Sequence, residues 1–174
     1  MSRYTVRAAT GVLGAALAAG ATVASVRNPT TSLSKLYVTR VDASFAATVA
    51  FTAASQQLFV IERFNTATPS GGTAYTAMRH SSAGGQLSTN VVDARASTTA
   101  ALTVTSVVFE GNQIPILGTA SPAVSTTHMG IPLFLAEDPI ILLPGEGLAI
   151  RNVVVWPAAG TGVLTALVSW TERS

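Results

Sequence analysis

Short runs of β-branched and aromatic residues, separated by glycine, proline and asparagine, recur along most of the chain. The clearest alternation lies in residues 35–45, where Leu36 and Val38 alternate with polar positions and Val41 continues the pattern less regularly. A period of two is typical of a strand with one buried face. Residues 57–64 predict a second strand, and the continuous apolar centre of this segment indicates burial on both faces.

The same signal predicts five further strands. They cover residues 100–109, 131–135, 140–143, 148–156 and 163–171. The sequence Pro144-Gly145-Glu146-Gly147 predicts a tight turn, because proline fixes φ and glycine can adopt a positive φ. Residues 157–162 predict another turn. We therefore expect residues 148–155 and 163–170 to form a hairpin near the C-terminus.

No segment repeats its apolar residues at the spacing of an amphipathic helix. Residues 13–21 are rich in alanine, but Gly14 and Gly20 weaken a helix there. Residues 66–85 predict a long loop, and loops of this length are commonly functional or interface-forming. Seven to nine short strands predict an all-β fold, which we expect to be a jelly-roll-like antiparallel β-sandwich with an extended N-terminal segment.

Residues 1–27 are expected to be distinct from the single sandwich domain of residues 28–174. Their apolar run resembles a signal peptide, but Thr10, Thr22 and Ser25 interrupt it. The run is also too short and too rich in alanine and glycine for a transmembrane helix. We expect this segment to be structural, either the first strands or an arm packing on neighbours. Fully extended, such an arm would span roughly 80 Å.

The charge content changes the expected surface. Charged residues make up 10% of the 174 residues, whereas a typical soluble domain contains about 25%. The mean hydropathy is +0.46, and a domain of this size buries only about 70% of the surface of its unfolded chain. Uncharged polar residues and permanent partners must therefore take the place of charge at the surface. Interfaces of obligate oligomers are poor in charge, so we expect a homo-oligomer.

The charges that exist do not indicate a ligand. The nine arginines and one lysine are scattered along the chain, so we expect no nucleic-acid binding. The absence of cysteine excludes disulfides, thiolate metal sites and cysteine nucleophiles. His80 and His128 are 48 residues apart and lack a metal-ligand spacing, so we expect no metal or cofactor. A small enzyme would need one of them beside a carboxylate such as Glu62 or Asp138.

The carboxylates are better explained as structural groups than as catalysts. Residues 137–138 are an adjacent acidic pair, and neighbours on a strand point to opposite faces. Glu62 with Arg63, and Asp93 with Arg95, are candidate ion pairs. Neither a nucleophile-elbow serine motif nor a nucleotide-binding fingerprint occurs. We therefore expect no enzymatic activity.

The two tryptophans are the largest aromatic side chains of the chain. Trp156 precedes a proline, and Trp170 lies near the end of the last predicted strand. Either could stack on a sugar, but packing in the core or in an interface is the favoured interpretation.

Several segments carry a resemblance that covers most of the chain in order. They are RAAT (7–10), VRN (26–28), FNTATPSGGTAYT (64–76), DARASTTAALT (93–103), LLPGEGLAIRNVVVWP (142–157) and VLTALVSWTE (163–172). Together they resemble a family of small structural proteins encoded beside the head genes of tailed bacteriophages. The resemblance implies a jelly-roll-like sandwich that decorates or cements the capsid, and it transfers no catalytic residue.

We therefore expect a capsid decoration, or cement, protein on the capsid surface of a virion. Its expected partners are the major capsid protein or other virion proteins and further copies of itself, with a trimer favoured and no membrane. The alternative is a tail, connector or head-fibre protein, which could bind a glycan. The residues expected at its interfaces lie in the N-terminal segment and in the long loop. They are Arg3, Tyr4, Arg7, Leu13, Leu17, Pro69, Tyr75 and Arg79.

Overall fold

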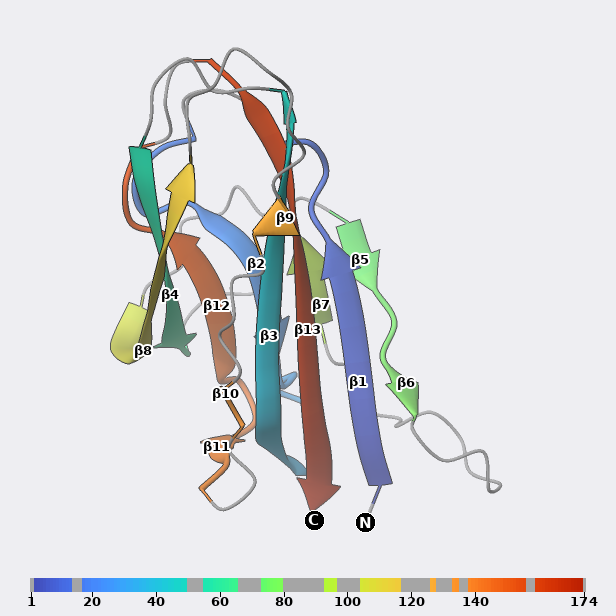
Figure 1. Ribbon diagram of the computed structural model, residues 1–174. Helices are drawn as coiled ribbons and strands as arrows, with labels where there is room; N and C mark the ends of the chain where they lie inside the picture. Colours follow the sequence, from blue (N-terminus) through green and yellow to red (C-terminus); the bar gives the residue numbers. More distant parts are fainter. Residues whose placement is uncertain are drawn as a thin grey trace.

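The computed structural model describes several stretches of the chain. They are residues 2–13, 17–49, 55–65, 73–79, 93–96, 104–116, 126–127, 133–134, 138–155 and 159–173. In these stretches the chain forms strands and no helix, which confirms the all-β prediction. The strands make two antiparallel sheets that share one hydrophobic core (Figure 1).

The first sheet has the order β10-β3-β13-β1-β6, and β9 and β11 also pair with β3. Its strands are β1 (Ser2–Ala9), β3 (Lys35–Val49), β6 (Met78–Arg79), β9 (Thr126–Thr127), β10 (Leu133–Phe134), β11 (Ile140–Leu142) and β13 (Thr161–Arg173). The second sheet has the order β5-β7-β2-β12-β4-β8. Its strands are β2 (Thr22–Arg27), β4 (Ser55–Phe64), β5 (Thr73–Tyr75), β7 (Asp93–Ala96), β8 (Val104–Ile116) and β12 (Gly147–Asn152).

The described part of residues 1–27 forms strands of these sheets. All eight residues of β1 pair with β13, and β2 lies between β7 and β12. The backbone of both strands is therefore hydrogen-bonded within the domain. Among the described residues, the segment consists of first strands and not of an arm reaching away from the domain.

The irregular alternation of residues 35–45 has a structural cause. Leu36 and Val38 are buried, and the buried face then continues at Val41. The register between β3 and β13 shifts at this point, so that Thr39 has no paired residue on β13. Such a β-bulge adds one residue to a strand and moves the following inward positions by one. The prediction of a strand here is confirmed.

The predicted C-terminal hairpin is wrong. β12 pairs with β2 and β4, whereas β13 pairs with β1 and β3, so the two strands belong to different sheets. β12 also ends at Asn152, four residues before the predicted end at Trp156. Each strand is central in its sheet and finds partners far away in the sequence, which a rule based on neighbouring segments cannot detect.

Other predicted elements are changed in extent. The strand predicted at 57–64 is confirmed as β4, where both Val60 and Ile61 are buried. The strand predicted at 100–109 corresponds to β8, which is described from Val104 to Ile116. The long loop predicted at 66–85 contains two short strands, β5 and β6, one in each sheet. The turn after Pro144 is confirmed, with Gly145 at φ +92°.

The space between the sheets is filled by aliphatic and aromatic side chains. Trp170 is fully buried and stacks on Tyr4, with ring centroids 6.0 Å apart. Apolar side chains from both sheets, including Val41 and Val168, line a cavity of about 20 Å³. Ser25, whose buried Oγ has no hydrogen-bond partner among the described residues, also lines it.

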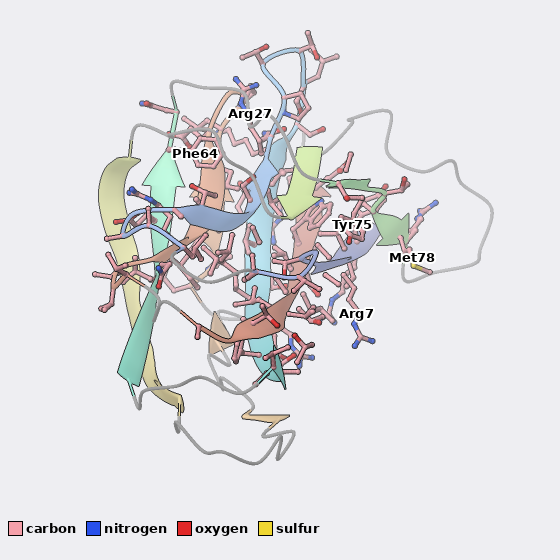
Figure 2. All side chains as sticks on the ribbon, turned by 90° about the horizontal axis from the view of Figure 1, so that it is seen from above. Arg7, Arg27, Phe64, Tyr75 and Met78 are labelled. Atoms are coloured by element: carbon pink, nitrogen blue, oxygen red, sulfur yellow. The ribbon has the colours of Figure 1, made fainter. Side chains whose placement is uncertain are left out.

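Phe64 forms a second, smaller buried cluster with Ala149 (Figure 2). Its ring lies against β12 where Gly147 leaves room, since a Cβ at that position would be 2.3 Å from the Phe64 Cζ atom.

Candidate interaction surfaces

The structure separates the predicted interface residues into surface and core. Arg3 and Arg7 are exposed, and Figure 2 shows the Arg7 side chain pointing away from the sheets. Tyr4 and Leu13 are 4% and 5% exposed and belong to the core, which corrects their assignment to an interface. Alternate residues of a strand face opposite sides, so Tyr4 points inward between two outward arginines.

Two of the other predicted interface residues, Leu17 and Tyr75, contact the rest of the domain. Leu17 and Tyr75 are half-buried and pack against the core. The Tyr75 hydroxyl donates a hydrogen bond to the backbone oxygen of Ala9, which ties β5 of one sheet to β1 of the other (Figure 2). Arg79 is half-buried in β6, and Pro69 lies outside the described residues.

Exposed apolar side chains gather at two places that the sequence analysis did not identify. Nine large apolar side chains of the described residues are exposed, and eight of them lie near the ends of the long strands. Five lie at the opposite strand ends of the two sheets, which we call the valine end: Val12 and Val49 beside the start of β13 in the first sheet, and Val153, Val154 and Val155 after β12 in the second. The other three, at what we call the basic end, are Leu33, Ile141 and Leu143. The ninth is Met78, at the edge strand β6.

The two ends lie on opposite sides of the molecule. Leu33 comes just before the start of β3, and Val49 is its last residue. The strand has 15 residues, so the two side chains are separated by roughly 45–50 Å at about 3.3 Å per residue. Figure 1 shows β3 running the length of the sheet between these ends.

The valine end is assembled from segments distant in sequence. Val49 is paired with Thr161 at the start of β13, and Val12 adjoins Leu13, whose backbone bridges to Gly162. The backbone N–H of Asn152 donates to Ala21 at 2.9 Å, and this contact holds the chain just before Val153.

Buried polar groups fix the bend that presents Val153, Val154 and Val155. Asn152 is 0% exposed, and its amide donates to the backbone oxygens of Ala18 and Val154. The neighbouring Arg151 donates from Nε and Nη2 to the oxygen of Gly20, at 2.9 and 2.8 Å. These bonds satisfy loop carbonyls that would otherwise lack partners. The three valines therefore follow a bend held by several hydrogen bonds, although the buried Oδ1 of Asn152 has no partner among the described residues.

The basic end is organised around Asn28, which is also 0% exposed. Its Nδ2 donates to the backbone oxygens of Ser34 at 2.9 Å and Leu142 at 3.1 Å. Its backbone N–H donates to Glu146, and its carbonyl accepts from Gly145, both at 2.8 Å. One residue thus joins the turn before β3 to the turn between β11 and β12.

Positive charge at this end exceeds negative charge by a small margin, because Glu172 of β13, which pairs with Leu36, and the exposed Asp138 before β11 also lie there. Lys35 and Arg3 are exposed and have no ion-pair partner among the described residues. Arg173 is exposed and lies 4.5 Å from the centre of the Tyr37 ring. The nearby Glu146 already accepts from the N–H of Leu143 and lies 3.8 Å from a guanidinium nitrogen of Arg63.

The ion pairs differ from those expected. Glu62 binds Arg151 at 2.7 Å, across two paired strands, and not Arg63. The expectation of a Glu62–Arg63 pair is wrong because consecutive strand residues point to opposite faces. The side chains of Asp93 and Arg95 lie outside the described residues. Three described ion pairs bring opposite charges within 4 Å, which lowers the charge available for an outside partner.

The described residues contain no cluster of three side chains able to hold a metal ion. His80 and His128 lie outside them, so the enzyme hypothesis is not addressed by their geometry. Glu62 is occupied by its arginine, and Asp138 is exposed. Trp170 is buried in the core and unavailable to a sugar, while Trp156 lies outside the described residues.

A search of the described residues for a helix long and apolar enough to cross a membrane finds none. The comparisons with known proteins add no relative: no family model, no curated protein and no solved structure matches the chain.

Proposed function

We propose that the chain is a structural protein of a virion, a capsid decoration protein that attaches to the head shell through protein–protein contacts and has no catalytic role. The observation that carries the proposal is the position of its exposed apolar side chains. Eight of the nine described ones lie at two opposite ends of the molecule. Two separate apolar surfaces are suited to contact two neighbours, as a subunit of an assembly must do.

The fold supports the same role. The first four strands, β1 to β4, alternate between the two sheets, and this part of the connectivity is compatible with a jelly-roll-like sandwich. The class of assembly comes from the resemblance of segments such as residues 64–76 and 142–157 to structural proteins encoded beside phage head genes.

Each single contact of this kind would be weak, which favours a partner that offers many identical binding sites. The five valines expose the equivalent of about two and a half complete valine residues, worth ~4 kcal/mol if buried. Association costs at least about 4 kcal/mol in lost freedom. A single contact of this kind is weak, so stable attachment requires several contacts at once. A trimer bound to a lattice of shell subunits provides them.

The basic end is the surface that we assign to the shell. Lys35, Arg173 and Arg3 lie on β3, β13 and β1, to one side of the exposed Ile141 of β11, and this combination complements an apolar surface with an acidic rim. The alternative, a glycan-binding tail protein, is less well supported, because Trp170, one of the two candidate residues for stacking on a sugar, is buried.

The test is to count and locate the chain in purified particles of the virus that encodes it, by quantitative mass spectrometry and electron cryo-microscopy. Hundreds of copies on the head are expected. Tens or fewer would favour a tail, connector or head-fibre protein, and absence from the particle would overturn the proposal. Deletion of residues 1–27 is unsuitable as a test, because it removes β1 and β2 from the sheets.

A point substitution tests the assigned surface. Lys35→Glu should lower occupancy on stripped particles and make the decrease with salt shallower, because the attraction to an acidic rim that salt would screen is lost. Arg7→Glu is the matched control, since it changes the net charge equally at an exposed position of the same sheet away from the basic end. Equal occupancy for Lys35→Glu and the unmodified chain would remove the basic end from the attachment site.

A further inference from the structure

We propose that the outward face of the first sheet, at the basic end, binds a short extended segment of a partner protein that is acidic at one end and apolar at the other. The inference rests on the proposed function, because it specifies which part of the basic end meets the partner and what chemistry that partner offers. The site consists of two adjacent rows of residues, which we call the outer strip. Its members are Ile141, Tyr37, Thr171 and Arg3 in one row and Lys35 and Arg173 in the other.

The register of the sheet places these residues on one face. Tyr37 pairs with Ile141 on one side and with Thr171 on the other, and Thr171 pairs with Arg3. Residues directly opposite each other on neighbouring strands share a face of the sheet. Leu36, just before Tyr37, is fully buried in the core, so the row faces outward. The strip lies where β1 begins and β13 ends (Figure 1).

The outer strip carries positive charge alone. Lys35 and Arg173 are directly paired across β3 and β13, and Arg3 lies on the next strand in the next row. At about 4.8 Å between strands and 3.3 Å per residue, the three backbone positions lie within about 12 Å of one another. Glu172 follows the opposite face of β13, and its Oε1 lies 3.5 Å from Nε1 of the buried Trp170. Its carboxylate is therefore on the other side of the sheet.

The paired cations are an arrangement that costs stability. Like charges directly opposite each other destabilise a pair of strands, and neither Lys35 nor Arg173 has an ion-pair partner among the described residues. Arg173 lies instead 4.5 Å from the centre of the Tyr37 ring. Folded chains tolerate such local conflicts mainly at functional sites. A bound anionic group would relieve the repulsion.

The composition of the outer strip identifies the occupant. Arginine suits carboxylates, which its guanidinium can bind through two parallel hydrogen bonds. The strip ends on β11 at Ile141, which is 40% exposed and beside Tyr37. A polyphosphate would bring charge against this apolar side, whereas a peptide can place carboxylates on the cations and an apolar side chain on Ile141. The four strands span about 14 Å, the length of four or five extended residues.

Peptide binding to the full chain tests the site. A fluorescein-labelled peptide of two leucines, one glycine and three aspartates should bind at low ionic strength, measured by fluorescence anisotropy. Arg173→Glu should raise its dissociation constant roughly tenfold or more. Arg7→Glu is the matched control, because it makes the same change of charge at an exposed position of β1 four residues from Arg3. Equal weakening by both variants, or by neither, would overturn the proposal.

Comparison probes test the chemistry of the occupant. A peptide with lysines in place of the aspartates should not bind, and one with serines in place of the leucines should bind more weakly. Tripolyphosphate should compete poorly with the labelled peptide. If the serine peptide binds as tightly as the leucine peptide, or if tripolyphosphate competes as well as the unlabelled leucine peptide, the strip recognises charge alone and the proposed occupant is wrong.

Stability supplies an independent measurement. Lys35→Gln removes one charge of the like-charged pair, so at low salt it should unfold at a higher urea concentration than the unmodified chain. The same variant should bind the acidic peptide more weakly. A lower urea midpoint for Lys35→Gln would contradict the repulsion from which the site is inferred.

The particle experiment separates the two proposals. Absence of the chain from virions, together with peptide binding that depends on Arg173, would reject the capsid role and keep the outer strip as a binding site. Presence on the head without such peptide binding would do the reverse.

Discussion

Replacing Asn28 tests how the basic end is held together. Its side chain is fully buried and donates two hydrogen bonds, to the backbone oxygens of Ser34 and Leu142. These bonds join the turn before β3 to the end of β11. The substitution Asn28→Ala removes both donors and leaves the backbone bonds of the residue in place.

The expected loss follows from these contacts. Each hydrogen bond contributes about 1 kcal/mol net, and a buried carbonyl left without a donor costs about 1–3 kcal/mol. The oxygen of Ser34 still accepts from the Ser32 hydroxyl, so the full penalty applies mainly at Leu142. We expect Asn28→Ala to lower the free energy of unfolding by about 2–4 kcal/mol.

Asn28→Asp provides a sharper version of the same test. This substitution keeps the shape of the side chain but directs a carboxylate at two carbonyl oxygens. It should therefore lower the free energy of unfolding at pH 7 by more than Asn28→Ala does. Protonation restores one donor, and burial makes the native state bind that proton more readily than the unfolded state. The stability of this variant relative to the unmodified chain should therefore rise as the pH falls toward about 4.

Urea unfolding followed by tryptophan fluorescence at fixed protein concentration measures these effects. Thr31→Ala, on the exposed part of the same turn, should change stability by less than about 0.5 kcal/mol. The reasoning fails if Asn28→Ala costs no more than Thr31→Ala, or if the cost of Asn28→Asp is the same at pH 4 and pH 7.

Three further substitutions test the packing. Gly147→Ala should lower the free energy of unfolding by about 3 kcal/mol or more in a chemical unfolding experiment, because its Cβ would lie 2.3 Å from Phe64 Cζ. Gly11→Ala, where the added Cβ has no atom within 4 Å, should leave the free energy of unfolding unchanged. Arg151→Met should lower the free energy of unfolding by about 2–3 kcal/mol, since it leaves a carboxylate of β4 unpaired; a loss below about 0.5 kcal/mol in thermal unfolding would contradict this. Val41→Ile should raise stability by about 0.5–1 kcal/mol, because one methylene matches the cavity of about 20 Å³, and a lower melting temperature would show that the cavity cannot accept it.

The sequence was informative wherever local chemistry decides the structure. The alternation of Leu36 and Val38 predicted β3, and the irregularity at Val41 coincides with the bulge that the structure shows. Gly145 adopts the positive φ that its turn requires. The preference of Trp170 for packing over solvent was also correct. Each of these depends on a residue and its neighbours in the chain.

The sequence predicted the candidate interaction surfaces less well than the strands. Arg3 and Arg7 are exposed, and their place in an interface stays a prediction, but Tyr4 between them is in the core. The run Val153–Val155 was visible as an apolar segment and was assigned to a strand. Nothing local shows that β12 ends at Asn152, because that depends on hydrogen bonds to loop residues more than 130 positions away.

By itself, then, the sequence determined the all-β class, the positions of several strands from β3 onward and the scarcity of charge. Strand formation and turn geometry follow from steric preferences and from the period of apolar residues, which are local properties. Only the tertiary structure decided that β12 and β13 lie in different sheets, that Glu62 pairs with Arg151, and which apolar residues remain outside. These outcomes depend on which distant segments pair, and that choice is made by the packing of the whole core.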